Sequence, residues 1–280
     1  MILHSLQIQE ILKTALQEDL GWGDITTQAL FPFKVKAKAI IFPKEEMVLA
    51  GGSVVKELFS ILDPQVIVNL HKKDGMRLKK GEKMITLLGD GRSLLKGERV
   101  ALNFLQRLSG IATLTSQYVN LVKGTPARIL DTRKTTPGLR ILERYAVAQG
   151  GGRNHRFHLG DAILIKDNHI ALARGLNSLL KSIRSASHSY APLEIEVKNL
   201  KEVRLALAGG VDIILLDNMK PPEIRKAVKL INGNAFIEAS GGVNLLNVRE
   251  IAETGVDFIS VGALTHSARA IDISMDIKRV

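Results

Sequence analysis

Residues 193–218 read LEIEVKNLKEVRLALAGGVDIILLDN, and this stretch contains a strand, a helix and a second strand in succession. The runs LEIEV (193–197) and VDIILL (211–216) are short and apolar, as buried strands are. The segment between them, 199–208, has helical character. Strands that alternate with helices in this way favour a parallel sheet with helices packed outside it.

The same alternation continues on both sides of this stretch. Four further apolar runs have the length of a strand: ARIL (127–130), AILI (162–165), NAFIEA (234–239) and VDFISV (256–261). Another helical segment lies at 221–231. The second half of the chain therefore predicts an α/β fold, and in a β/α barrel the carboxyl ends of such strands converge on one face, where the active site lies.

The first hundred residues have a different pattern, which predicts a small α+β unit. Helices are expected at 8–20 and 54–62, and strands at 34–41, 65–70 and 82–88. In the strand at 34–41, lysines alternate with apolar residues, which is typical of a half-exposed strand. A long helix is expected at 94–122, and Gly110 within it could interrupt the helix.

The composition of the chain excludes some classes of function and makes others unexpected. The 280-residue chain has no cysteine, which excludes disulfides and cysteine-based metal or thiol chemistry. We find no leader segment and no apolar run near the ~18 residues that a membrane helix needs, so we expect a cytoplasmic protein without a membrane partner. The net charge of +11 suits a polyanionic ligand, but the lysines are scattered and aromatic residues are only 4%, so nucleic acid is not the expected partner.

Charged residues and glycines stand where the predicted strands end. They are Asp131, Arg133 and Lys134 after ARIL, Lys166 and Asp167 after AILI, Glu196 in LEIEV, Asp217 and Asn218 after VDIILL, and Ser240, Gly241, Gly242 and Gly262 after the last two runs. Because strand ends converge in a barrel, these residues are expected to be neighbours in space.

The cations among these residues predict an anionic ligand. Arg133, Lys134, Arg156 and Lys166, with His155 nearby, would form a pocket that is costly to assemble unless it holds a multiply negative molecule. Arginine binds a carboxylate or phosphate through a planar fork, whereas lysine acts as a compact charge. Two kinds of cation therefore suggest two kinds of anionic group.

Acids and glycines complete the expected pocket. Glu196 and Asp217 could hold Mg²⁺, which prefers oxygen ligands, or each could pair with a neighbouring lysine. Glu194 lies on the same strand face as Glu196, and we choose Glu196 because it is nearer the strand end. The glycine turns after the last two strands could bind phosphate through backbone N–H groups, although glycine is also common in ordinary turns.

Two other kinds of site are compatible with the same residues. His155, His158 and His169 lie close together in the sequence and invite a zinc site, but no further acid or histidine completes a zinc motif. Lys166 could form a Schiff base with a carbonyl substrate, as lysines at the strand ends of barrel aldolases do. The cations around it could lower its pKa, so this alternative stays open.

The motifs taken together resemble the quinolinate phosphoribosyltransferase family. The resemblance rests on EDLGWGDITT (18–27), GERVALNFLQRLSGIAT (97–113), DTRKTTPGLR (131–140), GGGRNHRFHLGDAILIKDNHI (150–170), EIEV (194–197), LLDN (215–218), EASGGV (238–243) and VGALTHS (261–267). It implies an N-terminal α/β sandwich domain at 1–103, with a tail at 267–280 that could pack back on it, and an open, TIM-like α/β barrel at 104–266. It also implies a homodimer with shared active sites, which could assemble further into a hexamer.

The resemblance further implies a reaction. Members of the family join quinolinate to phosphoribosyl pyrophosphate (PRPP) with Mg²⁺ and no organic cofactor, and they form nicotinate mononucleotide, pyrophosphate and CO₂ for NAD biosynthesis. The resemblance assigns the following roles by position: Arg133, His155 and Arg156 bind the quinolinate carboxylates; Lys134 and Lys166 lie between the two substrates; Arg99 comes from the partner subunit; Glu196 and Asp217 serve the ribose and Mg²⁺; and Ser240, Gly241, Gly242 and Gly262 bind the 5′-phosphate. His158 departs from the family pattern.

Overall fold

The computed structural model describes residues 6–173, 175–186 and 191–280. The chain folds as two compact units, which are described separately. The first unit comprises the chain up to residue 116 together with 135–151 and 264–280, and the second comprises 117–134 and 152–263. The predicted domain boundary between residues 103 and 104 falls within a single long helix, and this boundary stays a prediction.

A four-stranded antiparallel sheet organises the first unit. Its order is β12 (Ile273–Arg279), β1 (Lys36–Pro43), β5 (Ile85–Asp90) and β3 (Ile67–Leu70). The expected alternation in β1 is confirmed, because Ala37, Ala39 and Ile41 are buried while Lys36 is exposed. A short antiparallel pair, β2 (Met47–Val48) with β4 (Arg77–Leu78), lies apart from this sheet.

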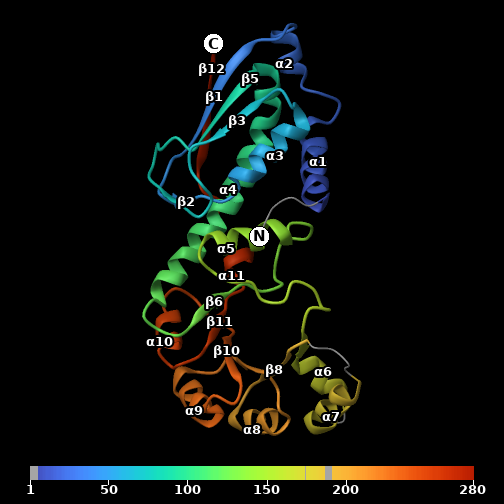
Figure 1. Cartoon of the computed structure of the whole chain (residues 1–280), viewed down its shortest axis with the longest axis vertical. Helices are drawn as coiled ribbons and strands as arrows, with labels where there is room; N and C mark the ends of the chain where they lie inside the picture. Colours follow the sequence, from blue (N-terminus) through green and yellow to red (C-terminus); the bar gives the residue numbers. More distant parts are fainter. Residues whose placement is uncertain (1–5, 174, 187–190) are drawn as a thin grey trace. The chain divides into compact units, whose positions relative to one another are not determined.

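Helices supply the rest of the first unit's core. They are α1 (Leu6–Leu20), α2 (Ile25–Leu30), α3 (Gly52–Leu62), the long α4 (Gly91–Leu121) and α5 (Arg140–Gln149). Figure 1 shows α1 and α3 beside each other next to the sheet, and Leu12, Leu58 and Phe59 are fully buried there. The predicted helices at 8–20, 54–62 and 94–122 are therefore confirmed, each with small shifts at its ends.

Gly110 does not interrupt α4, contrary to the expectation that it could. It lies in a continuous helix, and a Cβ at this position would lie well inside 3.0 Å of the backbone carbonyl oxygen of Arg269. The glycine is thus needed where the C-terminal segment approaches the helix, since any side chain would collide with that segment.

A six-stranded parallel sheet organises the second unit. Its order is β6 (Arg128–Leu130), β11 (Phe258–Ser260), β10 (Phe236–Ser240), β9 (Ile213–Asp217), β8 (Leu193–Val197) and β7 (Ile163–Ile165). Each of the six predicted apolar runs forms one of these strands. Among the described residues, β6 and β7 are not paired with each other, which agrees with the expected open barrel.

Helices connect the strands of the second unit. They are α6 (Asp167–Leu172), α7 (Leu176–Ala186), α8 (Leu200–Ala208), α9 (Pro221–Ile231), α10 (Val248–Ala252) and, where the chain leaves this unit, α11 (Ala263–His266). Figure 1 shows α8 and α9 outside the strands, as the alternating pattern predicts. In the described part of the chain, no helix has both the length and the apolar character needed to cross a membrane.

Candidate active site

A cavity of about 340 Å³ lies at the carboxyl ends of the second unit's strands. Residues of five strands (β7 to β11), of the segments that follow the strands and of the loop after α5 line it: Thr132, Arg133, Lys134, His155, Arg156, Leu164, Lys166, Glu196, Leu215, Asp217, Asn218, Glu238, Ser240, Gly241, Gly242 and Ser260. A larger cavity of about 570 Å³ in the first unit has a mostly apolar lining. The charged groups gather in the smaller cavity, which is therefore the candidate active site.

The loop that carries His155 and Arg156 is fixed beside β6. Arg153 forms a parallel bridge with Leu130, its backbone N–H donates to the carbonyl of Ile129 at 2.8 Å, and its own carbonyl accepts from the N–H of Asp131 at 3.0 Å. The buried carboxylate of Asp131 then accepts from the backbone N–H of His155 at 2.8 Å. Asp131 thus holds the loop in place and does not line the cavity.

Two arginines of the cavity lie close enough to affect each other. Burial and the positive charge of Arg133 both lower the pKa of Arg156. Arg156 is oriented by a hydrogen bond from its Nη1 to the carbonyl of Ala162 at 3.1 Å. Because like charges repel in a partly buried site, this arrangement fits a ligand with more than one negative group.

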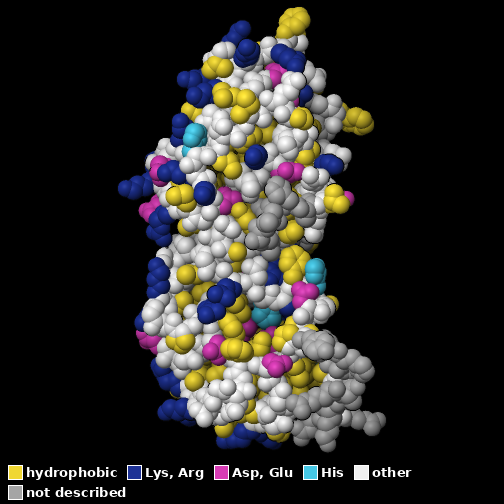
Figure 2. All heavy atoms as spheres, viewed as in Figure 1, with side chains coloured by type: hydrophobic (Ala, Val, Ile, Leu, Met, Phe, Trp, Pro, Cys, Tyr) yellow, Lys and Arg dark blue, Asp and Glu magenta, His cyan; other side chains and the backbone are white. Residues whose placement is uncertain are grey.

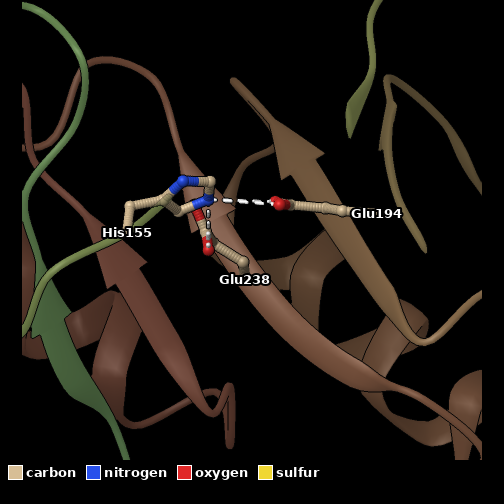
Figure 3. A group of neighbouring side chains, drawn as sticks. All are labelled: His155, Glu194 and Glu238. Carbon is tan, nitrogen blue, oxygen red and sulfur yellow. Dashed lines mark hydrogen bonds and ion pairs between the residues drawn. The ribbon is translucent and has the colours of Figure 1, made fainter. Parts of the chain in front are cut away.

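Beneath His155 lies a group of acids. The Nε2 atom of His155 is 3.1 Å from the Oε2 of Glu194 on β8 and 3.6 Å from the Oε2 of Glu238 on β10. Both carboxylates therefore approach the same ring nitrogen (Figure 3). Burial by itself lowers the pKa of His155, but the hydrogen bond to Glu194 and the charges of Glu238, Glu194 and Asp131 outweigh it and raise that pKa. Burial and the neighbouring Glu194 raise the pKa of Glu238.

Glu238 was missed as a site residue in the sequence, and Glu194 was set aside in favour of Glu196. The signal was present, because an acid within an apolar strand, two positions before the strand-end Ser240, must share the cavity face with it. On β8, Glu194 is buried, whereas Glu196 is half-buried.

Glu196 and Asp217 both line the cavity. Burial, followed by the charge of Asp217, raises the pKa of Glu196. Within the described parts of the chain neither acid forms an ion pair with a lysine, and Lys198 pairs with Asp167 at 3.0 Å instead. The two neighbouring carboxylates could hold a hard divalent cation such as Mg²⁺, and the charges of Lys166 and Lys198 also act on Glu196.

The turn after β10 has an unusual backbone. Gly241 and Gly242 have φ values of 91° and 62°, and Asn218 on the adjacent loop also has a positive φ, 54°. Asn218 donates from its backbone N–H to the carbonyl of Ser240 at 2.8 Å and from Nδ2 to the carboxylate of Asp217 at 2.9 Å. Asn218 therefore connects the glycine turn to one of the cavity's acids.

The other two histidines of the segment at 150–170, His158 and His169, do not join His155 in a metal site. His169 accepts a hydrogen bond on Nδ1 from the backbone N–H of Lys166 at 2.9 Å, at the start of α6. His158 is exposed, lies 3.6 Å from Asp161 and does not line the cavity. Among the described residues, the three side chains close enough to share one cation are His155, Glu194 and Glu238.

The structure places two of the predicted site residues outside this cavity. Arg99 is exposed on α4 in the first unit, and Gly262 follows β11 in the second unit without lining the cavity. The other predicted residues, from Arg133 to Gly242, come together in it. Thr132, Leu164, Leu215, Asn218 and Ser260 line it in addition and were not predicted as site residues.

Comparison with known proteins covers nearly the whole chain. Residues 24–109 match the model of the quinolinate phosphoribosyl transferase N-terminal domain, and residues 111–276 match that of the C-terminal domain. The chain is similar to the probable nicotinate-nucleotide pyrophosphorylase (carboxylating) of Bacillus subtilis, with 46% identity over 275 residues that cover 98% of this chain and 95% of that protein.

Solved structures agree with these sequence matches. The crystal structure of NadC from Streptococcus pyogenes has a TM-score of 0.96 at 42% identity and covers 100% of this chain and 99% of its own. The nicotinate-nucleotide pyrophosphorylase from Francisella tularensis has a TM-score of 0.93 at 39% identity, with 97% and 96% covered. The chain belongs to the quinolinate phosphoribosyltransferase family.

Proposed function

We propose that the protein transfers the phosphoribosyl group of PRPP to quinolinate, with decarboxylation, and forms nicotinate mononucleotide, pyrophosphate and CO₂. The observation that carries the proposal is the distribution of charge in one cavity. Arg133 and Arg156 are neighbours in it, and Glu196 lies near Asp217, which Asn218 connects to the glycine turn. A dicarboxylate and a phosphorylated sugar need these two environments side by side.

Quinolinate would bind at the cationic wall. Arg133 and Arg156 offer guanidinium forks for its two carboxylates, and His155 lies beside them. Lys134 and Lys166 would occupy the space between the two substrates, where negative charge of the pyrophosphate leaving group also accumulates. The pyridine nitrogen is itself the nucleophile, so no side chain has to attack.

PRPP would bind at the acidic wall. Loss of pyrophosphate leaves an oxocarbenium-like ribose, which the carboxylates of Glu196 and Asp217 would stabilise electrostatically. The same two carboxylates would hold Mg²⁺, which when bound neutralises charge on the diphosphate. The backbone N–H groups of the turn at Ser240, Gly241 and Gly242 would bind the 5′-phosphate.

Decarboxylation follows from the charge of the product ring. Once the nitrogen carries the ribose, the ring is cationic and stabilises the electron pair that the departing CO₂ leaves on the ring carbon. That carbon then takes up a proton from water. The residues around the ring have only to hold it in place, so an organic cofactor is not required. The Schiff-base alternative for Lys166 has no comparable support from relatives of the chain.

The experiment that tests this function supplies quinolinate, PRPP and Mg²⁺ to the purified protein and measures nicotinate mononucleotide and CO₂. We expect both products in equal amounts, and none from the Lys166→Ala protein. Nicotinate in place of quinolinate is the control substrate. Product from nicotinate alone would refute the decarboxylating reaction, and trapping of a carbonyl substrate on Lys166 by borohydride would favour the aldolase alternative.

We further propose a homodimer in which Arg99 completes the cavity of the partner subunit. Arg99 is exposed and lies in the other unit of its own chain, which is compatible with a contact between its side chain and the cavity of a second copy. Arg99→Ala and Lys166→Ala proteins, each inactive, should regain activity when mixed and allowed to exchange subunits. No recovery despite exchange shown by mass spectrometry would refute the shared site.

The proposed partners are small molecules in the cytoplasm, without nucleic acid or membrane. Figure 2 shows Lys and Arg side chains spread over the viewed face in several places, with no single basic patch on that face. This distribution supports a small anionic ligand bound in a cavity. Retention of the protein on a heparin column beyond physiological salt would argue against it.

A further inference from the structure

Three ionisable side chains meet beneath the cationic wall of the cavity. Glu194 and Glu238 are 2% and 1% exposed, and both approach Nε2 of His155, at 3.1 and 3.6 Å. The strand between them, β9, contributes the apolar Leu215, which is paired in register with Glu238. The two acids therefore face the histidine from two strands that flank an apolar one.

Burying two carboxylates lowers the stability of the fold unless each has a hydrogen-bond donor or a cation as a partner. Carboxylates that are nearly inaccessible to water lose their hydration, and an unpaired buried charge is strongly destabilising. The ring of His155 is a partner of both acids, and Glu238 also has a hydrogen bond with the side chain of Ser260. The backbone N–H of His155 donates to Asp131. Three contacts from three elements thus fix one residue at the cavity wall.

The contacts also determine the chemistry of the ring. Because Nε2–H donates inward to Glu194, the imidazole can donate from its other nitrogen, Nδ1, only when it carries a positive charge. Nδ1 lies on the side of the ring away from both carboxylates (Figure 3). The two acids thereby favour an oriented cation next to Arg133 and Arg156.

We propose that Glu194 and Glu238 are positioning residues that fix the imidazole of His155 through Nε2 and so set the affinity for the dicarboxylate substrate. The proposal rests on the proposed function, because it assigns the substrate to the wall that His155 shares with Arg156. Neither glutamate needs to touch the substrate. Their effect passes through the ring that they hold.

The competing explanation is a metal site. The three ligand atoms lie within 4.8 Å of one another, so a cation could bind between them. However, Nε2 of His155 already has a hydrogen bond with Oε1 of Glu194 at 3.4 Å and lies 3.1 Å from its Oε2, and two arginines line the same cavity. These facts favour a histidine held by carboxylates, and the test below measures metal content directly.

The test compares Glu194→Gln and Glu238→Gln with substitutions of two other acids that hydrogen-bond to the same two strands, β8 and β10. Asp212 accepts from the backbone N–H of Leu193 at 2.7 Å, and Asp257 accepts from that of Ile237 at 2.8 Å, so each acid supports one of these strands at its opposite end. Asp212→Asn and Asp257→Asn therefore control for damage to β8 and β10 that does not involve His155.

We expect each glutamine variant to raise KM for quinolinate about ten-fold or more, which is the effect of losing one charged hydrogen bond. KM for PRPP should not change, and the two control variants should change neither value. In a His155→Ala background, Glu194→Gln should have no further effect on KM for quinolinate, because the residue it positions is gone. This double-mutant cycle of Glu194 and His155 tests the proposal even if the Glu238→Gln protein does not fold.

Three results would overturn the proposal. One is an equal rise in KM for both substrates, which indicates general damage to the cavity. Another is an unchanged KM for quinolinate in a folded variant. The third is one equivalent of a first-row metal in the wild-type protein that both glutamine variants lose. If the wild-type protein forms nicotinate mononucleotide, the proposed function stands, and each of these results then counts against the positioning role of the two glutamates alone.

Discussion

Replacing Gly241 by alanine should disable the PRPP side of the cavity. Gly241 has a φ of 91°, and a Cβ placed there would lie well inside 3.0 Å of the side-chain amide of Asn218. Asn218 cannot move without consequence, because its Nδ2 donates to Asp217 and its backbone N–H donates to Ser240. The added methyl group would therefore disturb the glycine turn and the acidic wall together.

The size of the effect follows from two costs. A residue with a Cβ in left-handed backbone loses ~1–2 kcal/mol relative to glycine. Overpacking by one methyl group against a held neighbour adds about 1–3 kcal/mol, which is relieved only if Asn218 releases Asp217. Gly242 has a similar φ of 62°, but a Cβ there would have only a 4.0 Å contact with Asn218, so Gly242→Ala has the first cost without the second.

The assay is steady-state kinetics with each substrate varied in turn, together with thermal unfolding. Gly241→Ala should raise KM for PRPP by at least about five-fold more than Gly242→Ala does, as about 1 kcal/mol or more of additional cost requires, while KM for quinolinate stays close to the wild-type value. Equal effects of the two substitutions would refute the reasoning, because they would show that backbone strain alone matters and that the contact with Asn218 does not.

Three further predictions concern other parts of the chain. Gly110→Ala should lower the free energy of unfolding by about 3 kcal/mol through collision with the Arg269 carbonyl, whereas Gly160→Ala, with no atom within 4 Å of the added carbon, should leave the thermal midpoint unchanged. The hydrogen bond to Arg269 lowers the pKa of Glu45 from 4.5 to about 2. The wild-type protein should therefore be more stable than Glu45→Gln above pH 4.5, and this difference should disappear as the pH falls towards 2. Thermal midpoints of both proteins measured over this pH range would show it. Arg156→Ala should raise KM for quinolinate far more than KM for PRPP in steady-state assays, and equal losses would contradict a carboxylate clamp.

The sequence was sufficient for the strands of the second unit and for most of the cavity. Apolar runs bounded by charges or glycines locate strand ends, and parallel strands bring their carboxyl ends to one face whatever lies between them. Arg133, Lys166 and Asp217 are neighbours for that reason alone. The same logic applied two residues earlier on each strand would have included Glu238.

Other features could not be read from local patterns. The interaction of Gly110 with the segment at 269 joins positions far apart in the chain, so a helix-interrupting glycine and a glycine required by close packing look identical in sequence. Asp131 raised the same difficulty, because a strand-end acid that holds a loop and one that faces a ligand differ only in what lies beside them. Only three-dimensional packing separates these alternatives.

The two glutamates of β8 show how one residue type serves two purposes in this fold. Glu194 and Glu196 share a face and are separated by about 6.6 Å along the strand, at 3.3 Å per residue. The deeper one is almost inaccessible to water and contacts His155, whereas the shallower one lies beside Asp217 at the cavity surface. In the proposed function, depth along the strand would assign one acid to support a cation and the other to face a sugar and its metal. In this proposal β8 serves both substrates, because the buried Glu194 orients His155 and Glu196 faces the cavity.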